Sequence, residues 1–333
     1  MYYVVAFVVA LAAVLSVTPV ARRIAFRAGF LDLPNKRKVH RKPTPLLGGL
    51  AILVGFLAAF LVGAKLQQVS FSFPLVGFLL GAVWVFLVGL IDDRWGIGPL
   101  PKLLGQVVAC AFLFFSGNTN DLITSAPLDL FFSFLWVVGL MNALNFLDNM
   151  DGIASGITFL ASMGFFALAV LNGQATAALI AIALAGASLA FLRFNFHPAS
   201  IFLGDAGSLL FGYVLASLGL MSTWHQTSYV YLVVPVLILG YPIFDVSFVV
   251  LTRIGRGSHI YIPGKDHTSH RLGTLLANVR GTAFAVYAVC FCLAMAGVAL
   301  SLATSEMFYL SAILLAALLF LLGGARLSRV PIQ

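Results

Sequence analysis

The sequence predicts an all-α, polytopic integral membrane protein with about eleven transmembrane helices. Hydrophobic residues make up 61% of its 333 residues, charged residues only 9%, and the mean hydropathy is +1.05. Too few charges are present to cover a soluble globule, so a soluble protein is excluded. The three cysteines all lie in apolar segments, which argues against a disulfide framework and against a cysteine-rich zinc site.

Apolar runs of about 15–22 residues mark the expected spans, because an α-helix of this length crosses the ~30 Å hydrocarbon core of a bilayer. The weakest run, 127–143, is short and has Asp129 near its start. The runs lie near 2–20, 46–64, 71–91, 102–117, 127–143, 155–172, 174–192, 206–222, 229–251, 281–301 and 307–323.

Basic residues predict the orientation of these spans. No Lys or Arg precedes the first run and Arg22, Arg23 and Arg27 follow it, so it is expected to be an uncleaved anchor with the N-terminus outside. With alternating crossings, one side carries 18 of the 19 Lys and Arg residues and the other only Lys65. The positive-inside rule makes the basic side cytoplasmic. Its segments are 21–45, 92–102, 142–154, 193–205, 252–280 and 324–333, which places the C-terminus in the cytoplasm.

The stretch from Met141 to Gly156 carries the most unusual polar pattern. Asn145, Asp148 and Asp151 are three residues apart, and at this spacing they would share one face of a helix. Two carboxylates held together at a membrane boundary cost free energy unless a cation, a proton or hydrogen-bond donors offset their charge. A metal or phosphate-handling site explains the pattern. A helix-ending turn is the alternative, because Asn, Asp and Gly favour turns.

Two further acidic clusters fall on the same side of the membrane. Asp92 and Asp93 directly follow a span, and as an isolated pair they could be a solvated helix end. Asp205 precedes another span and could be an N-cap, although the flanking Gly204 and Gly207 also leave room for a metal–diphosphate beside the backbone. Because Mg²⁺ binds carboxylate oxygens together with substrate phosphates, the acidic clusters are predicted to share one site.

Thr44 lies in a basic segment that ends at a glycine pair. Most of the Lys and Arg residues before it are explained as a topology signal next to anionic lipid. Gly48 and Gly49 at the entrance of the next span would let backbone N–H groups approach an anion closely. Phosphate contact at this segment is therefore one expectation, and a purely topological role is the other.

The longest polar loop contains His267, His270 and Arg271. A zinc site that adds His259 is an alternative, but no cysteine lies nearby and the spacing matches no common structural site. Histidine and arginine side chains are better suited to hold a diphosphate, the arginine by bidentate hydrogen bonds.

Three other polar residues are left with open or ordinary roles. Asp245 could pair with Arg253 or Arg256, or it could face the site. His197 and His225 carry no sequence feature that predicts a function.

Five motifs occur in a fixed order between the spans, at residues 43–49, 91–93, 145–152, 202–208 and 266–272. They read Pro-Thr-Pro-Leu-Leu-Gly-Gly, Ile-Asp-Asp, Asn-Phe-Leu-Asp-Asn-Met-Asp-Gly, Phe-Leu-Gly-Asp-Ala-Gly-Ser and Asp-His-Thr-Ser-His-Arg-Leu. Together they resemble the polyprenyl-phosphate N-acetylhexosamine-1-phosphate transferases. The resemblance implies that a sugar 1-phosphate passes from a UDP-sugar to a polyprenyl phosphate, with release of UMP and dependence on Mg²⁺, or on Mn²⁺ as an alternative.

The resemblance also implies roles for individual residues. Asp205 is the implied main magnesium ligand, and Asp92 and Asp93 are the implied paired catalytic carboxylates. Across all motifs, the implied catalytic residues are Asp92, Asp93, Asp151 and His270, the metal ligands Asp205 and Asp148, and the substrate-binding residues Thr44, Asn145, Asp148, His267 and Arg271. The chain 1–333 would then be a single transmembrane catalytic domain, with active-site loops at 21–45, 92–102, 142–154, 193–205 and 252–280.

One departure from the family bears on the donor. The branch that transfers phospho-N-acetylmuramoyl-pentapeptide carries adjacent histidines in the last loop, whereas Thr268 and Ser269 separate the two histidines here. This difference favours the branch that uses UDP-N-acetylglucosamine.

Two other classes of membrane protein remain alternatives. A secondary transporter also uses carboxylates within a polytopic bundle, but it places them near the bilayer midplane. An intramembrane prenyltransferase also binds magnesium diphosphate through Asp-rich motifs, but it would not explain residues 202–208 or the His-Arg loop. The expected partners are a UDP-sugar, a polyprenyl phosphate and the cell membrane, with a homodimer as one assembly. The basic residues that give the net charge of +8 are explained by their place on the predicted cytoplasmic side, so no nucleic-acid partner is expected.

Overall fold

A computed structural model describes residues 1–34, 42–118, 125–221, 232–259, 264–303 and 306–331 of the chain. Each of the predicted apolar runs contains helix within these ranges. Nine of the described helices are long and apolar enough to cross a membrane, and one shorter apolar helix accompanies them. The prediction of an all-α, polytopic membrane protein is therefore confirmed, while the number of crossings and the sidedness of the termini stay predictions.

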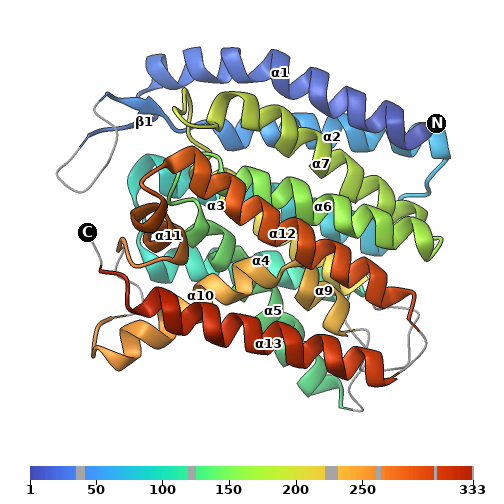
Figure 1. Cartoon of the computed structure of the whole chain (residues 1–333). Coiled ribbons are helices and arrows are strands. Elements are labelled where there is room, and N and C mark those ends of the chain that lie inside the picture. Colours follow the sequence, from blue (N-terminus) through green and yellow to red (C-terminus); the bar gives the residue numbers. More distant parts are fainter. Residues whose placement is uncertain (35–41, 119–124, 222–231, 260–263, 304–305, 332–333) are drawn as a thin grey trace.

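The elements follow one another in a single bundle (Figure 1). Their bounds are α1 Tyr2–Ala28, β1 Leu31–Asp32, β2 Thr44–Pro45, α2 Gly48–Gln67, α3 Phe73–Trp95, α4 Pro99–Phe115, α5 Ala126–Leu147, α6 Ile153–Leu171, α7 Ala175–Asn195, α8 Gly204–Met221, α9 Val233–Ile238, α10 Gly240–Gly255, α11 Thr268–Leu276, α12 Val279–Ser301 and α13 Glu306–Ser328. β1 and β2 form one short antiparallel pair.

The run at 229–251 is divided into α9 and α10, a break that the hydropathy pattern does not predict. The break falls at Leu239. Pro242 has no backbone N–H, so the carbonyl of Ile238 has no partner four residues later and the helix cannot continue regularly through this point. The second piece, α10, then carries Asp245 and Arg253 toward the loop that precedes α11.

The short helix α11 is a second difference from the sequence prediction. Its nine residues lie in the last polar loop, and the apolar pattern of Leu272, Leu275 and Leu276 covers only one turn, which is too short to predict a helix. His267 is its N-cap residue, and the helix ends at Ala277, whose φ of 49° lies in the left-handed region.

Helix α8 lies at the centre of the bundle and α13 at its edge. The apolar window of α8 is 94% buried inside the protein, whereas that of α13 is only 11% buried. Figure 1 shows α1 along one edge of the bundle and α13 along the opposite edge. It also shows β1, α11 and the end of α13 at the end of the bundle opposite to the start of α1.

Close helix contacts at glycine bring α2 and α3 against the first turn of α8. A Cβ atom added to Gly49 would lie 2.4 Å from the backbone nitrogen of Gly207, and one added to Gly89 would lie 2.4 Å from both Cα and nitrogen of Ala206. Only glycine permits this approach, because any larger side chain would meet backbone that cannot move aside cheaply. Gly89 therefore sets where the end of α3, four residues later, meets α8.

We expect Gly89→Ala to lower the melting temperature of the detergent-solubilised protein. The added methyl group forces α3 away from α8, and overpacking of this kind costs about 1–3 kcal/mol. Gly139→Ala in α5 is the matched control, since nothing lies within 4 Å of its added Cβ and alanine favours helix over glycine. Equal melting temperatures for the two variants would contradict this account of the α3–α8 contact.

Candidate active site

The N-terminus of α8 is capped by a carboxylate from another helix. Asp93, near the end of α3, accepts hydrogen bonds from the backbone N–H groups of Asp205 at 2.7 Å and Ala206 at 3.1 Å. The first N–H groups of a helix have no partner within the helix, and a carboxylate there also faces the positive end of the helix dipole. Both oxygens of Asp93 are thus used to hold α3 to α8, a structural role that sequence reasoning missed. Its predicted catalytic role stays a prediction.

Lys102 joins the two other aspartates at this point. Its ammonium lies 2.7 Å from Oδ2 of Asp92 and 2.6 Å from Oδ2 of Asp205. Sequence reasoning counted Lys102 only among the cytoplasmic basic residues. The signal that could have found it is its place at the start of an otherwise apolar helix, nine residues after the Asp pair. One positive charge therefore links carboxylates that lie more than 100 residues apart in the chain.

Asn145 brings the end of α5 to the same cluster. Its side-chain amide donates to Oδ1 of Asp205 at 2.6 Å and to the hydroxyl of Ser208 at 2.9 Å. One helical turn deeper, Gln106 of α4 and Asn142 of α5 exchange hydrogen bonds of 2.8 and 3.3 Å. This second pair fixes α4 and α5 side by side, so that Lys102 and Asn145 reach Asp205 together.

Asp148 ends α5 and lies within the field of three other carboxylates. Burial and then the negative charges of Asp205, Asp93 and Asp151 hold its pKa well above the ordinary value for aspartate. The charges of these three aspartates act on Asp148 because the carboxyl groups lie near one another. The structure therefore gathers the acidic clusters of residues 92–93, 148–151 and 205 at one site.

Asp151 contacts a histidine to which the sequence gave no function. Its Oδ2 accepts a hydrogen bond from Nδ1 of His197 at 2.8 Å and another from the backbone N–H of Ala199 at 3.0 Å. Both donors belong to the segment between α7 and α8. This contact ties the α5–α6 loop to the segment that leads into Asp205.

The Thr44 segment is attached to the same region by its backbone. The N–H groups of Gly48 and Gly49 donate to the carbonyls of Phe202 and Leu203, at 3.1 and 2.9 Å. The expectation that these two N–H groups face an anion is therefore wrong, because protein carbonyls already accept from them. Thr44 itself is buried and donates to the carbonyl of Lys42 at 3.2 Å. Its substrate-binding role stays a prediction.

The last polar loop forms a neighbouring cluster around His267. The open question about Asp245 is answered by its contacts: it accepts from Nδ1 of His267 and from the backbone N–H of Thr268, both at 2.7 Å. Arg253 forms two hydrogen bonds with Asp266, of 2.6 and 2.7 Å. The His267 ring packs edge-on against Phe146, with 6.3 Å between ring centroids, so the loop lies beside the residue that follows Asn145.

Arg271 and His270 differ from the cationic pair that the sequence predicted. Arg271 is only 1% exposed, and its Nη1 donates to the carbonyls of Leu327, Ser328 and Val330. It thus fixes the end of α13. Burial, followed by the charge of His267, lowers the pKa of His270 to about 4, so this ring is neutral at neutral pH. Contact of either side chain with a diphosphate stays a prediction.

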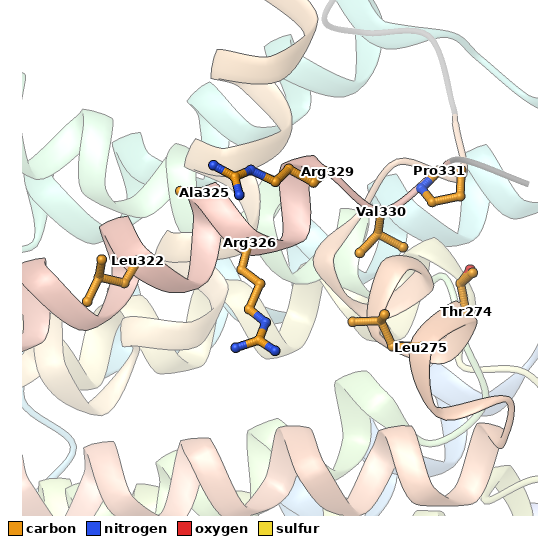
Figure 2. Close-up of a pocket in the computed structure, with 8 residues that line it drawn as sticks. All are labelled: Thr274, Leu275, Leu322, Ala325, Arg326, Arg329, Val330 and Pro331. Carbon is orange, nitrogen blue, oxygen red and sulfur yellow. The ribbon is translucent and has the colours of Figure 1, made fainter.

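A groove of about 730 Å³ lies between α11 and the end of α13 (Figure 2). None of the predicted site residues lines it. Arg326 and Arg329 extend from α13 in different directions rather than converging on one point. The groove is therefore separate from the aspartate cluster. Its lining residues are Thr274, Leu275, Leu322, Ala325, Arg326, Arg329, Val330 and Pro331.

The aspartate cluster suits a cation that keeps some of its water. Within the described ranges, no three Asp, Glu, His or Cys side chains form a complete metal cage. Mg²⁺, however, is normally bound by one or two carboxylates together with water and substrate phosphates. The ammonium of Lys102 shows that Asp92 and Asp205 are within reach of a single positive centre. Asp92, Asp148 and Asp205 are only partly buried, which leaves them accessible to solvent.

Comparison with known proteins identifies the family. A model of glycosyl transferase family 4 matches residues 75–223. The chain is 32% identical to a probable undecaprenyl-phosphate N-acetylglucosaminyl 1-phosphate transferase of Bacillus subtilis, over 90% of this chain and 86% of that protein. It is 30% identical to the decaprenyl-phosphate N-acetylglucosaminephosphotransferase of Mycobacterium tuberculosis, over 75% of this chain and 70% of that protein. It is 31% identical to the phospho-N-acetylmuramoyl-pentapeptide-transferase of Bacillus licheniformis, over 61% of this chain and 69% of that protein.

The relatives also confirm the predicted resemblance and its branch. The two proteins named for N-acetylglucosamine match more of this chain than the pentapeptide transferase does. The segment matched by the family model contains Asp92, Asp148 and Asp205, the residues that the structure gathers at one site. Because the Bacillus subtilis relative is 32% identical over 90% of this chain and 86% of its own length, the chain belongs to glycosyl transferase family 4.

Proposed function

We propose that this chain transfers N-acetylglucosamine 1-phosphate from UDP-N-acetylglucosamine to a polyprenyl phosphate and releases UMP. The names of the Bacillus subtilis and Mycobacterium tuberculosis relatives supply the acceptor class and the sugar. The observation that carries the proposal is the meeting of Asp92, Asp205 and Lys102 at the N-terminus of a buried helix. Such a cluster suits the handling of phosphate and of a cation, and packing alone does not require it.

We propose that the reaction takes place at the cytoplasmic face of the cell membrane. Support comes from the basic residues, because 18 of 19 fall in segments that alternate crossings put on one side. The segments that carry the aspartates are predicted to lie on that same side. A lipid phosphate has its head group at the membrane interface, so a site at this depth can be reached by both substrates.

A divalent cation, most simply Mg²⁺, is part of the proposal. Asp205 and Asp148 would hold it, with Asp92 close by. When bound, it would neutralise charge on the transferred phosphoryl group and on the leaving UMP. The acidic donor set fits such an ion, because oxygen atoms of carboxylates are the ligands that Mg²⁺ prefers.

The chain's own residues supply binding and orientation. A phosphate monoester has a second pKa near 6, so the acceptor is mostly dianionic at neutral pH and can attack the diphosphate directly without a strong general base. The ammonium of Lys102 is close enough to Asp92 and Asp205 to attract an incoming phosphate to the cluster. Asp93 keeps α3 and α8 together and so preserves the spacing of Asp92 and Asp205.

The proposal is tested by measuring UMP release from membranes that contain the protein. UDP-N-acetylglucosamine and other UDP-sugars are each supplied with undecaprenyl or decaprenyl phosphate, with and without Mg²⁺. We expect UMP only when a UDP-sugar, a lipid phosphate and the cation are all present, with N-acetylglucosamine as the preferred sugar. A transporter would move its substrate without forming UMP, and a prenyltransferase would release diphosphate instead.

Asp205→Asn should lower UMP formation by at least about 100-fold while the protein still inserts into membranes. The amide keeps the shape of the side chain but removes the charge that binds both Lys102 and the proposed cation. Asp129→Asn is the control, because Asp129 lies in the first turn of α5, far along the helix from Asn145. Near-normal turnover by Asp205→Asn would remove Asp205 from the proposed metal site.

Asp148→Asn should raise the melting temperature at and above neutral pH in buffer without divalent cations. The pKa of Asp148 is raised in the folded protein, so the folded state loses stability as pH rises through that pKa and a negative charge forms among the other carboxylates. Asparagine never acquires this charge. At acidic pH the wild-type carboxyl is protonated, and the two melting curves should then coincide. A wild-type protein that is the more stable of the two at pH 8 would show that Asp148 carries no such strain.

A further inference from the structure

We propose that the groove between α11 and the end of α13 binds the head group of an anionic phospholipid. The lipid would come from the membrane leaflet at this end of α13, which the basic residues predict to be the cytoplasmic one. None of the aspartates of the candidate active site lines the groove. The proposal therefore concerns a second site and does not depend on the proposed reaction.

The groove lies where α13 leaves the apolar part of the membrane. Among the candidate spans of the described residues α13 is the least covered by protein, with 11% of its apolar window buried. Its Leu318, Leu321 and Leu322 are exposed, so in a membrane these side chains meet acyl chains. Arg326 and Arg329 follow about one and two turns after Leu322. This is the level at which arginine side chains reach lipid head groups.

The lining combines an apolar wall with positive charge. Five of the eight lining residues are apolar and two are arginines, and none of these eight described residues is acidic. A phospholipid needs both features, because its phosphate is charged while its glycerol carries acyl chains. A free inorganic anion would gain nothing from the apolar wall. The groove volume of about 730 Å³ lies within the ~300–1,000 Å³ of typical small-ligand sites.

Arg326 and Arg329 border the groove rather than meeting inside it. Figure 2 shows their side chains leaving α13 in different directions. Two converging guanidinium groups would suit a small free phosphate, which they could hold together. Divergent arginines suit a larger ligand that lies against the apolar wall between them. Within the part of the chain that the structure describes, neither arginine forms an ion pair, so both charges are left for a ligand.

Arg271 offsets the negative field that the end of a helix would otherwise present to an anion. The last carbonyl groups of a helix lack partners within it and carry partial negative charge. At the end of α13, Nη1 of Arg271 donates to the carbonyls of Leu327 at 3.0 Å, Ser328 at 3.3 Å and Val330 at 2.6 Å. A buried guanidinium thus lies directly beside the groove, of which Val330 is part of the lining.

The other charges near Arg271 do not cancel this positive field. Arg256, exposed at the end of α10, acts electrostatically on Arg271 and adds a further positive charge. The carboxylate that acts on Arg271 belongs to Asp266, and it is already paired with Arg253 at 2.6 Å. An anion that approaches the groove therefore meets net positive charge.

The first test measures binding of dioleoyl-phosphatidylglycerol to the purified, detergent-solubilised full chain by native mass spectrometry. We expect saturable binding that is tighter than binding of dioleoyl-phosphatidylcholine, which has the same acyl chains and no net charge. Arg326→Gln combined with Arg329→Gln should weaken phosphatidylglycerol binding about 10–30-fold, the loss expected for two basic side chains at an anionic lipid surface.

The matched control removes two arginines from the opposite edge of the bundle. Arg22 and Arg23 are exposed near the end of α1, on the same predicted side of the membrane, and Figure 1 shows α1 along the edge opposite to α13. Arg22→Gln combined with Arg23→Gln lowers the net charge by the same amount. This control should leave the saturable phosphatidylglycerol binding nearly unchanged.

A second test locates the lipid on the unaltered protein. Phosphatidylglycerol with a diazirine in its acyl chain near the glycerol is cross-linked by light, and the labelled peptides are identified. We expect labels on α11 and on the end of α13. Excess unlabelled phosphatidylglycerol should remove these labels, whereas inorganic phosphate should not. Because this readout needs no variant, it decides the proposal even if the double variant fails to fold.

Five outcomes would overturn the proposal. Three are equal binding of the two phospholipids, equal losses in the two double variants, and labels confined to other helices. The fourth is competition by inorganic phosphate, which would show a site for a small anion. The fifth is competition by an equimolar polyprenyl phosphate, which would make the groove part of the acceptor site.

Discussion

The site depends on the hydrogen bonds between the Asp93 carboxylate and the first N–H groups of α8. Helix α8 is the most buried of the candidate membrane spans, so its N-terminus lies inside protein and its free N–H groups need partners. Asp93 provides both oxygens from α3. Gly89, one turn earlier, lets the two backbones touch. Together these contacts fix Asp92 on α3 and Asp205 on α8 at a distance that one cation can bridge, and the ammonium of Lys102 does bridge it.

Electrostatic cost explains why the surrounding contacts are needed. Burial, followed by the charges of three other carboxylates, raises the pKa of Asp148. Lys102 and Asn145 offset the charge of Asp205, and His197 together with the Ala199 N–H does the same for Asp151. A fold that keeps so many acidic groups together loses stability to do so, which is common where charge serves function. The neighbouring histidine loop repeats the pattern, since Asp245 and Asp266 are each paired with a basic side chain.

The sequence predicted the features that depend on local composition. Apolar length located the helices, and the excess of acidic residues in short motifs located Asp92, Asp148 and Asp205. It did not predict the break before Gly240, where Pro242 removes one backbone donor within an apolar run. It also missed α11, whose first residues are held by Asp245 and Asn149 from other segments rather than by an apolar face of their own.

Partners far apart in the chain account for the remaining differences. From the sequence, Lys102 is only one more basic residue on the predicted cytoplasmic side, because its partner Asp205 lies on a different helix. Gly48 and Gly49 were expected to offer their N–H groups to an anion, but the carbonyls of Phe202 and Leu203 accept these hydrogen bonds. No local pattern identifies such a partner, because each contact exists only once the helices have packed.

The claim that these aspartates form one cation site is tested most directly by Mn²⁺ binding, followed by electron paramagnetic resonance on the purified protein. The account predicts one saturable Mn²⁺ site per chain, competed by Mg²⁺ and strongly weakened in Asp205→Asn. Absence of saturable binding in the wild type, or equal binding by Asp205→Asn, would contradict it.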